Sequence, residues 1–237
     1  MLVAATVCPH PPVLVAGAAS TAAADLAGLR QICHESVRRL VDTAPDRIVV
    51  VGGGPAAGEW DGDAAGSLAA YGLDVTFGSG DAVLPLSLTI GCHLLDEANW
   101  PSRQRGFVAV TDAMDPSECA AIGAGLVAGP DGVALLVMGD GSAKRTRTSP
   151  GYVDERAINY DDHVVNALDK GDCDALLELT PELGRELWVA GRPAWQVLAG
   201  AGRAAYDAAR VVQATVRYDD APYGVGYAVV DWELAPA

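Results

Sequence analysis

Short runs of apolar residues alternate along the chain with longer stretches in which apolar and polar positions are mixed. The run at residues 48–51, Ile-Val-Val-Val, has no polar position, which is typical of a parallel strand covered on both faces. In the longer stretches apolar residues recur every three or four positions, which is the spacing of one helix face. The alternation of these patterns predicts a mostly parallel sheet with helices on both faces.

Strands are predicted where an apolar run is bounded by turn residues, and helices where the helical spacing persists. The predicted strands are 2–7, 47–51, 74–77, 106–111, 132–138, 211–218 and 224–232. The predicted helices are 84–99, 115–127, 153–168, 173–179, 181–189 and 193–209, together with an earlier helix that begins at a Ser20 or Thr21 cap and ends near 43. Residues 56–72 predict an irregular excursion.

The last two predicted strands are joined by a short polar turn, so we expect an antiparallel hairpin at the C-terminal edge of the sheet. The chain contains no linker, repeat or low-complexity tract. The predicted fold is therefore a three-layer α/β/α structure in which residues 1–237 form a single domain.

Composition and charge limit the classes of binding partner that we expect. The formal net charge of −15 at pH 7 argues against binding to nucleic acid or anionic lipid, and no apolar run reaches 18 residues, so we expect no membrane span. The five cysteines form no CxxC pair, which is typical of reduced thiols in a cytoplasmic protein. A homo-oligomer remains open.

The segment at residues 135–145 is the centre of the predicted site. The apolar strand there ends in Gly-Asp-Gly-Ser, and ligands of open α/β sheets bind at the carboxyl ends of strands. Asp140, Ser142 and Lys144 are the catalytic candidates. Lys144 and Arg145 also predict a subsite for a small anion, while the alternative is that these cations only form surface ion pairs.

Two further groups are candidates for metal binding or proton transfer. His10 follows the first strand in a proline-rich loop, where it can be a metal ligand, a general base or a loop histidine bonded to the backbone. Glu182 and Glu186 are four residues apart and share one helix face, which is also the pattern of a solvated surface.

The turn at residues 52–58, Gly-Gly-Gly-Pro-Ala-Ala-Gly, follows a strand and satisfies GxGxxA, a pattern of flavin- and nicotinamide-binding proteins. Such a site requires a helix that directs its N-terminus at the pyrophosphate. The residues that follow the turn are a poor helix and carry Glu59, Asp61 and Asp63. An oxidoreductase of this class is therefore an alternative and not the favoured hypothesis.

Several segments together resemble the class III extradiol ring-cleavage dioxygenase superfamily, the LigB-like group that includes the Memo-type proteins. The matching segments, spread over nearly the whole chain, are Cys8-Pro9-His10-Pro11-Pro12-Val13-Leu14, residues 49–55, Met138-Gly139-Asp140-Gly141-Ser142, Gly191-Arg192-Pro193, Leu198-Ala199-Gly200-Ala201 and residues 223–228. The resemblance implies the LigB-like α/β/α fold and an Fe(II)-dependent cleavage of catechol-like rings.

In that family two histidines and usually a carboxylate hold a non-haem iron, and a further histidine acts as acid and base. The first ligand corresponds to His10, and Glu182 or Glu186 would supply the carboxylate. The second ligand position falls in the turn with Gly53 and Pro55, and the acid/base position is Ala143, so both histidines are absent.

The favoured hypothesis is therefore a divergent member without a cofactor. It keeps the family pocket and binds a small anionic or aromatic molecule with residues such as His10, Gly53, Pro55, Asp140 and Ser142. The alternative within the family is an active Fe(II) dioxygenase with an unusual set of metal ligands.

Overall fold

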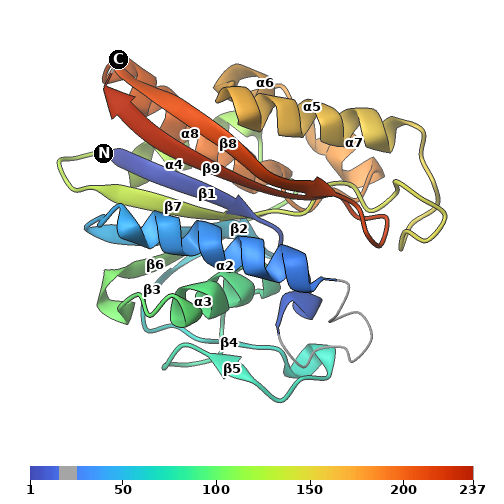
Figure 1. Cartoon of the computed structure of the whole chain (residues 1–237), viewed down its shortest axis with the longest axis horizontal. Helices are drawn as coiled ribbons and strands as arrows, with labels where there is room; N and C mark the ends of the chain where they lie inside the picture. The colour runs from blue at the N-terminus through green and yellow to red at the C-terminus, as the bar shows by residue number, and fades with distance from the viewer. Residues whose placement is uncertain (16–25, 237) are drawn as a thin grey trace.

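The computed structural model describes residues 1–15 and 26–236, and its centre is a twisted seven-stranded sheet (Figure 1). The strands of this sheet are β1 (Leu2–Cys8), β2 (Arg47–Gly53), β3 (Gly58–Asp61), β6 (Arg105–Val110), β7 (Val133–Met138), β8 (Arg210–Asp220) and β9 (Tyr227–Pro236), in the spatial order β3-β6-β2-β7-β1-β9-β8. A separate two-stranded sheet pairs β4 (Gly66–Ser67) with β5 (Thr76–Phe77).

The four central strands are parallel, as the apolar runs predicted. β7 lies between β1 and β2, and β2 also pairs with β6. Met138 is in register with Cys8 on one side and with Gly52 on the other, while Gly53 is in register with Val110. The carboxyl ends of all four strands therefore meet at one edge of the sheet.

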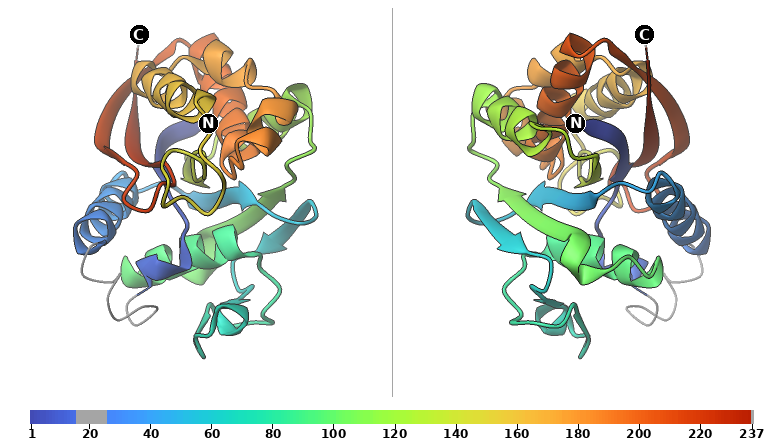
Figure 2. Two further views of the ribbon diagram at one scale, coloured as in Figure 1. Left: turned by 90° about the vertical axis from the view of Figure 1, so that its right-hand side faces the viewer. Right: turned by 90° about the vertical axis from the view of Figure 1, so that its left-hand side faces the viewer.

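Helices cover both faces of the sheet, which confirms the three-layer α/β/α prediction (Figure 2). Val49 and Val51 of β2 pack into one core, while Ile48 and Val50 pack into the other. The helices on the first face are α4 (Pro116–Leu126), α5 (Arg156–Lys170), α6 (Cys173–Leu177), α7 (Pro181–Glu186) and α8 (Arg192–Asp207); those on the second are α2 (Ala27–Asp42) and α3 (Leu86–Glu97).

The two edges of the sheet are antiparallel. β8 and β9 form the predicted C-terminal hairpin, and β9 pairs with β1. At the opposite edge β3 pairs with β6 inside the segment expected to be irregular, so that expectation was wrong at residues 58–61. An edge strand needs a partner on one side only, and charged residues such as Glu59 and Asp61 are common there because they prevent pairing with other chains.

Other helix and strand boundaries in the structure differ by a few residues from the predicted boundaries. The strand predicted at 74–77 is only β5, outside the main sheet, and α5 begins at Arg156 instead of residue 153. Asp115 caps the N-terminus of α4 in a capping box that includes Glu118. The described residues also contain the short 3-10 helices η1 (Pro12–Leu14), η2 (Ala69–Tyr71) and η3 (Ser102–Gln104). The proposed caps Ser20 and Thr21 lie outside the described residues.

No helix in the described ranges has both the length and the apolar character needed to cross a membrane.

Candidate functional site

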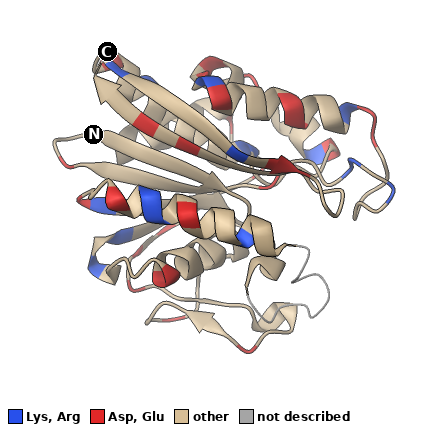
Figure 3. Ribbon diagram, in the orientation of Figure 1, with Lys and Arg blue, Asp and Glu red and all other residues tan. Residues whose placement is uncertain are grey.

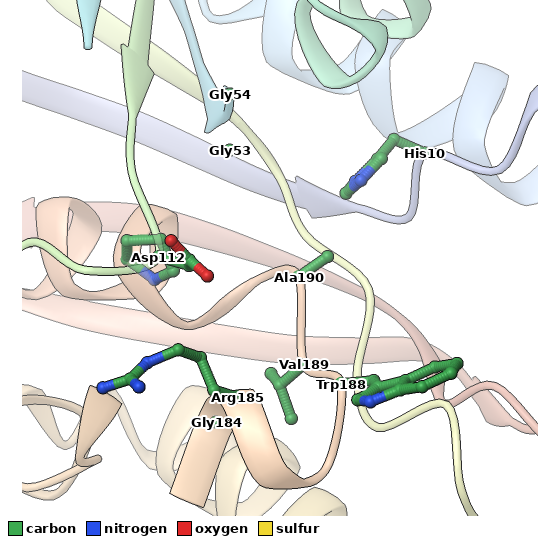
Figure 4. Close-up of a pocket in the computed structure, with 10 residues that line it drawn as sticks. His10, Gly53, Gly54, Asp112, Gly184, Arg185, Trp188, Val189 and Ala190 are labelled. Atoms are coloured by element: carbon green, nitrogen blue, oxygen red, sulfur yellow. The ribbon is translucent and has the colours of Figure 1, made fainter. Parts of the chain in front are cut away.

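A cavity of about 380 Å³ lies at the edge where the parallel strands end (Figure 4). We call it the His10 cavity; its lining consists of His10, Gly53, Gly54, Asp112, Gly184, Arg185, Trp188, Val189, Ala190 and Pro193. The first four residues follow or end strands, and the others come from α7, the start of α8 and the segment between them. This is the position at which open α/β sheets bind ligands.

Strand register explains why these strand-end residues meet. Cys8, Met138 and Val110 end β1, β7 and β6 at the same edge, and His10, Asp140 and Asp112 each follow two residues later. The predicted proximity of His10 and Asp140 is therefore confirmed, because the backbone N–H of His10 donates to Asp140 Oδ1 at 2.8 Å.

His10 is the buried imidazole of the cavity. The residue is 7% exposed, and its ring points from the end of β1 into the cavity (Figure 4). Nδ1 lies 3.6 Å from Asp140 Oδ1, too far for a hydrogen bond, and neither ring nitrogen has a hydrogen-bond partner among the described residues. The side chain is thus held with Nδ1 buried beside a carboxylate, while no described residue occupies Nε2.

Asp112 faces His10 across the cavity (Figure 4). Its carboxylate makes no hydrogen bond or ion pair within the described residues, although its backbone carbonyl accepts from Arg192 Nη2 at 2.7 Å. Asp112 was not among the predicted site residues. The signal was present, since Asp112 is the first carboxylate after a third predicted parallel strand.

Gly53 and Gly54 form the wall at the end of β2, and Pro55 is exposed and outside the lining. Ser87 Oγ donates to the Gly53 carbonyl at 2.6 Å and fixes this turn. A Cβ at position 53 would lie 3.1 Å from the carbonyl oxygen of Ala190, so the wall is already in close contact with the segment that precedes α8. This is the place where the resembled family carries its second iron ligand.

Glu182 and Glu186 do not join His10. Their side chains are 71% and 56% exposed, and they pair with Arg185 and Arg156 respectively. Neither glutamate lines the His10 cavity. In residues 1–15 and 26–236 no three His, Cys, Asp or Glu side chains form a group that can hold a metal ion. The described residues therefore do not fit the iron site of the resembled family, and the proposed His10 and glutamate ligand set is corrected.

The loop at residues 140–149 has its own anchor away from the cavity. The backbone N–H and the hydroxyl of Ser142 donate to the carboxylate of Asp161 at 2.8 and 2.9 Å. Arg145 Nη1 lies 3.7 Å from the same carboxylate, and Lys144 Nζ lies 5.4 Å from the centroid of the Trp188 ring. The loop cations are thus not gathered at the cavity, although Lys144 reaches its rim through Trp188.

Asp161 is a buried carboxyl with unusual titration. Burial raises its pKa to about 6, although the hydrogen bonds from Ser142 and the charge of Arg145 lower it. The cost of removing the carboxylate from water therefore exceeds the effect of its partners.

The glycine turn leads to a strand instead of a helix. After Pro55 the chain enters β3, which pairs with β6. The helix N-terminus that would receive a dinucleotide pyrophosphate is missing from this turn. The structural context of a flavin or nicotinamide site is therefore not present there.

No family model and no curated protein matches this chain. The fold is similar to the crystal structure of uncharacterized protein JW3007 from Escherichia coli K12, with a TM-score of 0.49 and 16% sequence identity. That match covers 97% of this chain and 99% of the other. The description of that protein names no activity, so a function has to be inferred from the His10 cavity itself.

Proposed function

We propose that this chain binds a small aromatic molecule with a hydroxyl group in the His10 cavity. It would be a divergent LigB-like protein that keeps the pocket of the dioxygenases without their iron site. The observation that carries the proposal is the buried imidazole of His10, which points into the cavity and has no hydrogen-bond partner among the described residues.

Asp140 orients the imidazole for this role. Its carboxylate lies beside Nδ1, so it favours the tautomer in which Nδ1 carries the proton and Nε2 is the acceptor. A phenolic hydroxyl can then donate to Nε2. No described residue bonds Nε2, so a ligand hydroxyl supplies the partner that this nitrogen lacks within the protein. A hydrogen bond of this kind contributes about 0.5–1.5 kcal/mol net.

The remaining lining suits a flat ring. Val189, Ala190 and Pro193 provide apolar surface, and the indole of Trp188 lies at the edge of the cavity on the same side as His10 (Figure 4). Ligand cavities commonly combine apolar walls with a few polar groups that set orientation. The buried free cysteines, among them Cys8, are consistent with a protein that works in the reducing cytoplasm.

The test is calorimetric titration of phenol, catechol and 4-hydroxybenzyl alcohol into wild type, His10→Ala and His163→Ala. We expect the wild type to bind, and we expect His10→Ala to bind about tenfold or more weakly, because the hydrogen bond to Nε2 and the contact with the imidazole are lost. His163 is exposed on α5, so its variant is the matched control and should bind as the wild type does.

Two results would overturn the proposal. One is the absence of binding by any of the three compounds, or equal binding by wild type and His10→Ala. The other is tight one-to-one binding of Fe(II) under anaerobic conditions that His10→Ala abolishes, followed by ring cleavage on addition of oxygen. The second result would restore the active dioxygenase.

A further inference from the structure

The lining of the His10 cavity includes a carboxylate that no described side chain bonds. Asp112 is exposed, and its carboxylate faces the cavity without a hydrogen bond or ion pair among the described residues. Asp140 is outside the lining and accepts from the backbone N–H of His10, so it adds negative charge near His10. Arg185 is the cation of the lining, but Figure 4 shows its side chain directed away from the centre of the cavity. Its Nη2 donates to Glu182 Oε1 at 3.3 Å.

Arg192 fixes the backbone of Asp112 in place. Arg192 is 1% exposed and lies at the start of α8. Its Nη2 donates to the backbone carbonyls of Asp112 and Met114 at 2.7 and 3.1 Å, and its Nη1 donates to Gln196 Oε1 at 2.5 Å. All three acceptors are uncharged, and the guanidinium attracts the Asp112 carboxylate through space without a hydrogen bond to it. The loop after β6 is therefore held while the carboxylate oxygens remain open to a ligand.

Gln196 extends this anchor to α6 and to the residues that lead into α7. Its Nε2 donates to the carbonyls of Leu176 and Leu179 at 3.1 and 2.8 Å. One buried pair of side chains therefore ties the Asp112 loop to the segment immediately before α7, the helix that contributes Gly184 and Arg185 to the lining. Such preorganisation lowers the entropic cost of binding a ligand at Asp112.

We propose that Asp112 is a ligand-binding carboxylate that makes the His10 cavity selective for an aromatic molecule carrying an ammonium group. This inference rests on the proposed function and deepens it. An ammonium forms a charge-assisted hydrogen bond with a carboxylate, whereas a ligand carboxylate at the same place meets like charge. The net charge of −15 acts in the same direction at longer range.

The experiment compares three ligands that share a phenol ring and differ in one substituent. They are 4-hydroxybenzylamine, 4-hydroxybenzoate and the neutral 4-hydroxybenzyl alcohol. Titration calorimetry at pH 7 and low salt gives the Kd of each for wild type, Asp112→Asn and Asp42→Asn. Asp42 is an exposed residue at the C-terminal end of α2, so its variant matches the change in net charge.

We expect the wild type and Asp42→Asn to bind the amine about tenfold or more tightly than the benzoate. Asp112→Asn should reduce that ratio to about threefold or less while its Kd for the neutral alcohol changes little. Equal ratios in Asp112→Asn and wild type, or tighter binding of the benzoate by wild type, would overturn the inference. Binding of the alcohol separates this failure from failure of the proposed function, which predicts that the alcohol binds in every case.

Discussion

Asp161, outside the cavity, is a carboxyl whose burial raises its pKa. It is 4% exposed and accepts two hydrogen bonds from Ser142, and these bonds hold the loop that begins at Asp140. Ser142 therefore has a structural partner, and Arg145 lies beside the same carboxylate. The partner is a buried carboxylate and not one of the surface acids that follow in sequence.

The raised pKa of Asp161 predicts a specific dependence of stability on pH. The unfolded carboxyl ionises near its ordinary value of 3.8, while the folded one ionises at about 6. The folded state therefore binds more protons in this window. The stability contributed by the protonated form is fully present below pH 4 and is lost as the pH rises through 6. The difference of about two pKa values corresponds to about 3 kcal/mol.

Asp161→Asn removes this titration. Urea unfolding at pH 4, 5, 6 and 7 gives the free energy of unfolding of wild type and variant. We expect the wild-type value minus the variant value to fall by about 2–3 kcal/mol from pH 4 to pH 7. Asp162→Asn, which changes the exposed neighbour, should give a nearly constant difference. A constant difference for Asp161→Asn as well would contradict the assigned pKa.

At the scale of the elements, α4 and α8 are held in an unusually close crossing. A Cβ on Gly200 would overlap the backbone carbonyl oxygen of Ala120, and a Cβ on Gly123 would overlap that of Val197. Both obstacles are backbone atoms, which cannot move without shifting a helix. The two glycines therefore determine how near α8 lies to α4, and α8 carries the anchor Arg192 at its start.

Gly200→Ala should lower the free energy of unfolding by about 1–3 kcal/mol, because the added methyl group overpacks this crossing. Gly125→Ala is the matched control in α4, since a Cβ there meets nothing within 4 Å. That variant should gain about 0.5–1 kcal/mol from the better helix propensity of alanine. Chemical unfolding measures both, and equal stability of Gly200→Ala and wild type would show that the helices can separate at no cost.

For the whole molecule, the excess of negative charge is the dominant electrostatic feature. Figure 3 shows acidic residues on helices of both outer layers and on the β8–β9 hairpin. The described ion pairs of exposed residues, such as Arg203 with Asp174, contribute little each. Self-repulsion at a net charge of −15 therefore opposes the compact state more than these pairs support it.

Salt should consequently stabilise the protein. We expect the Tm at pH 7 to rise by a few degrees between 20 mM and 500 mM sodium chloride, because screening weakens the repulsion among exposed carboxylates. Potassium chloride should act equally, which distinguishes screening from binding of one particular cation. A Tm that falls over this range would mean that attractive pairs outweigh the repulsion.

The sequence by itself determined the layers of the fold and the edge of the sheet where the candidate site lies. The run at residues 48–51 has no polar position, which is typical of burial on both faces, and the mostly apolar runs of β1 and β7 predicted strands parallel to it. Chain direction then places the residues after them, His10 and Asp140, at one edge. These conclusions depend only on local spacing, which is why they survived comparison with the structure.

Only the tertiary structure decided which side chains face the cavity. Asp112 and Glu182 both carry carboxylates, but Asp112 is presented by strand register, whereas Glu182 sits on the exposed face of α7. The partner of Arg145 is Asp161, a residue sixteen positions away on α5. Register between strands and the packing of α7 and α8 are set by contacts between distant segments, and the local pattern of a sequence does not contain those contacts.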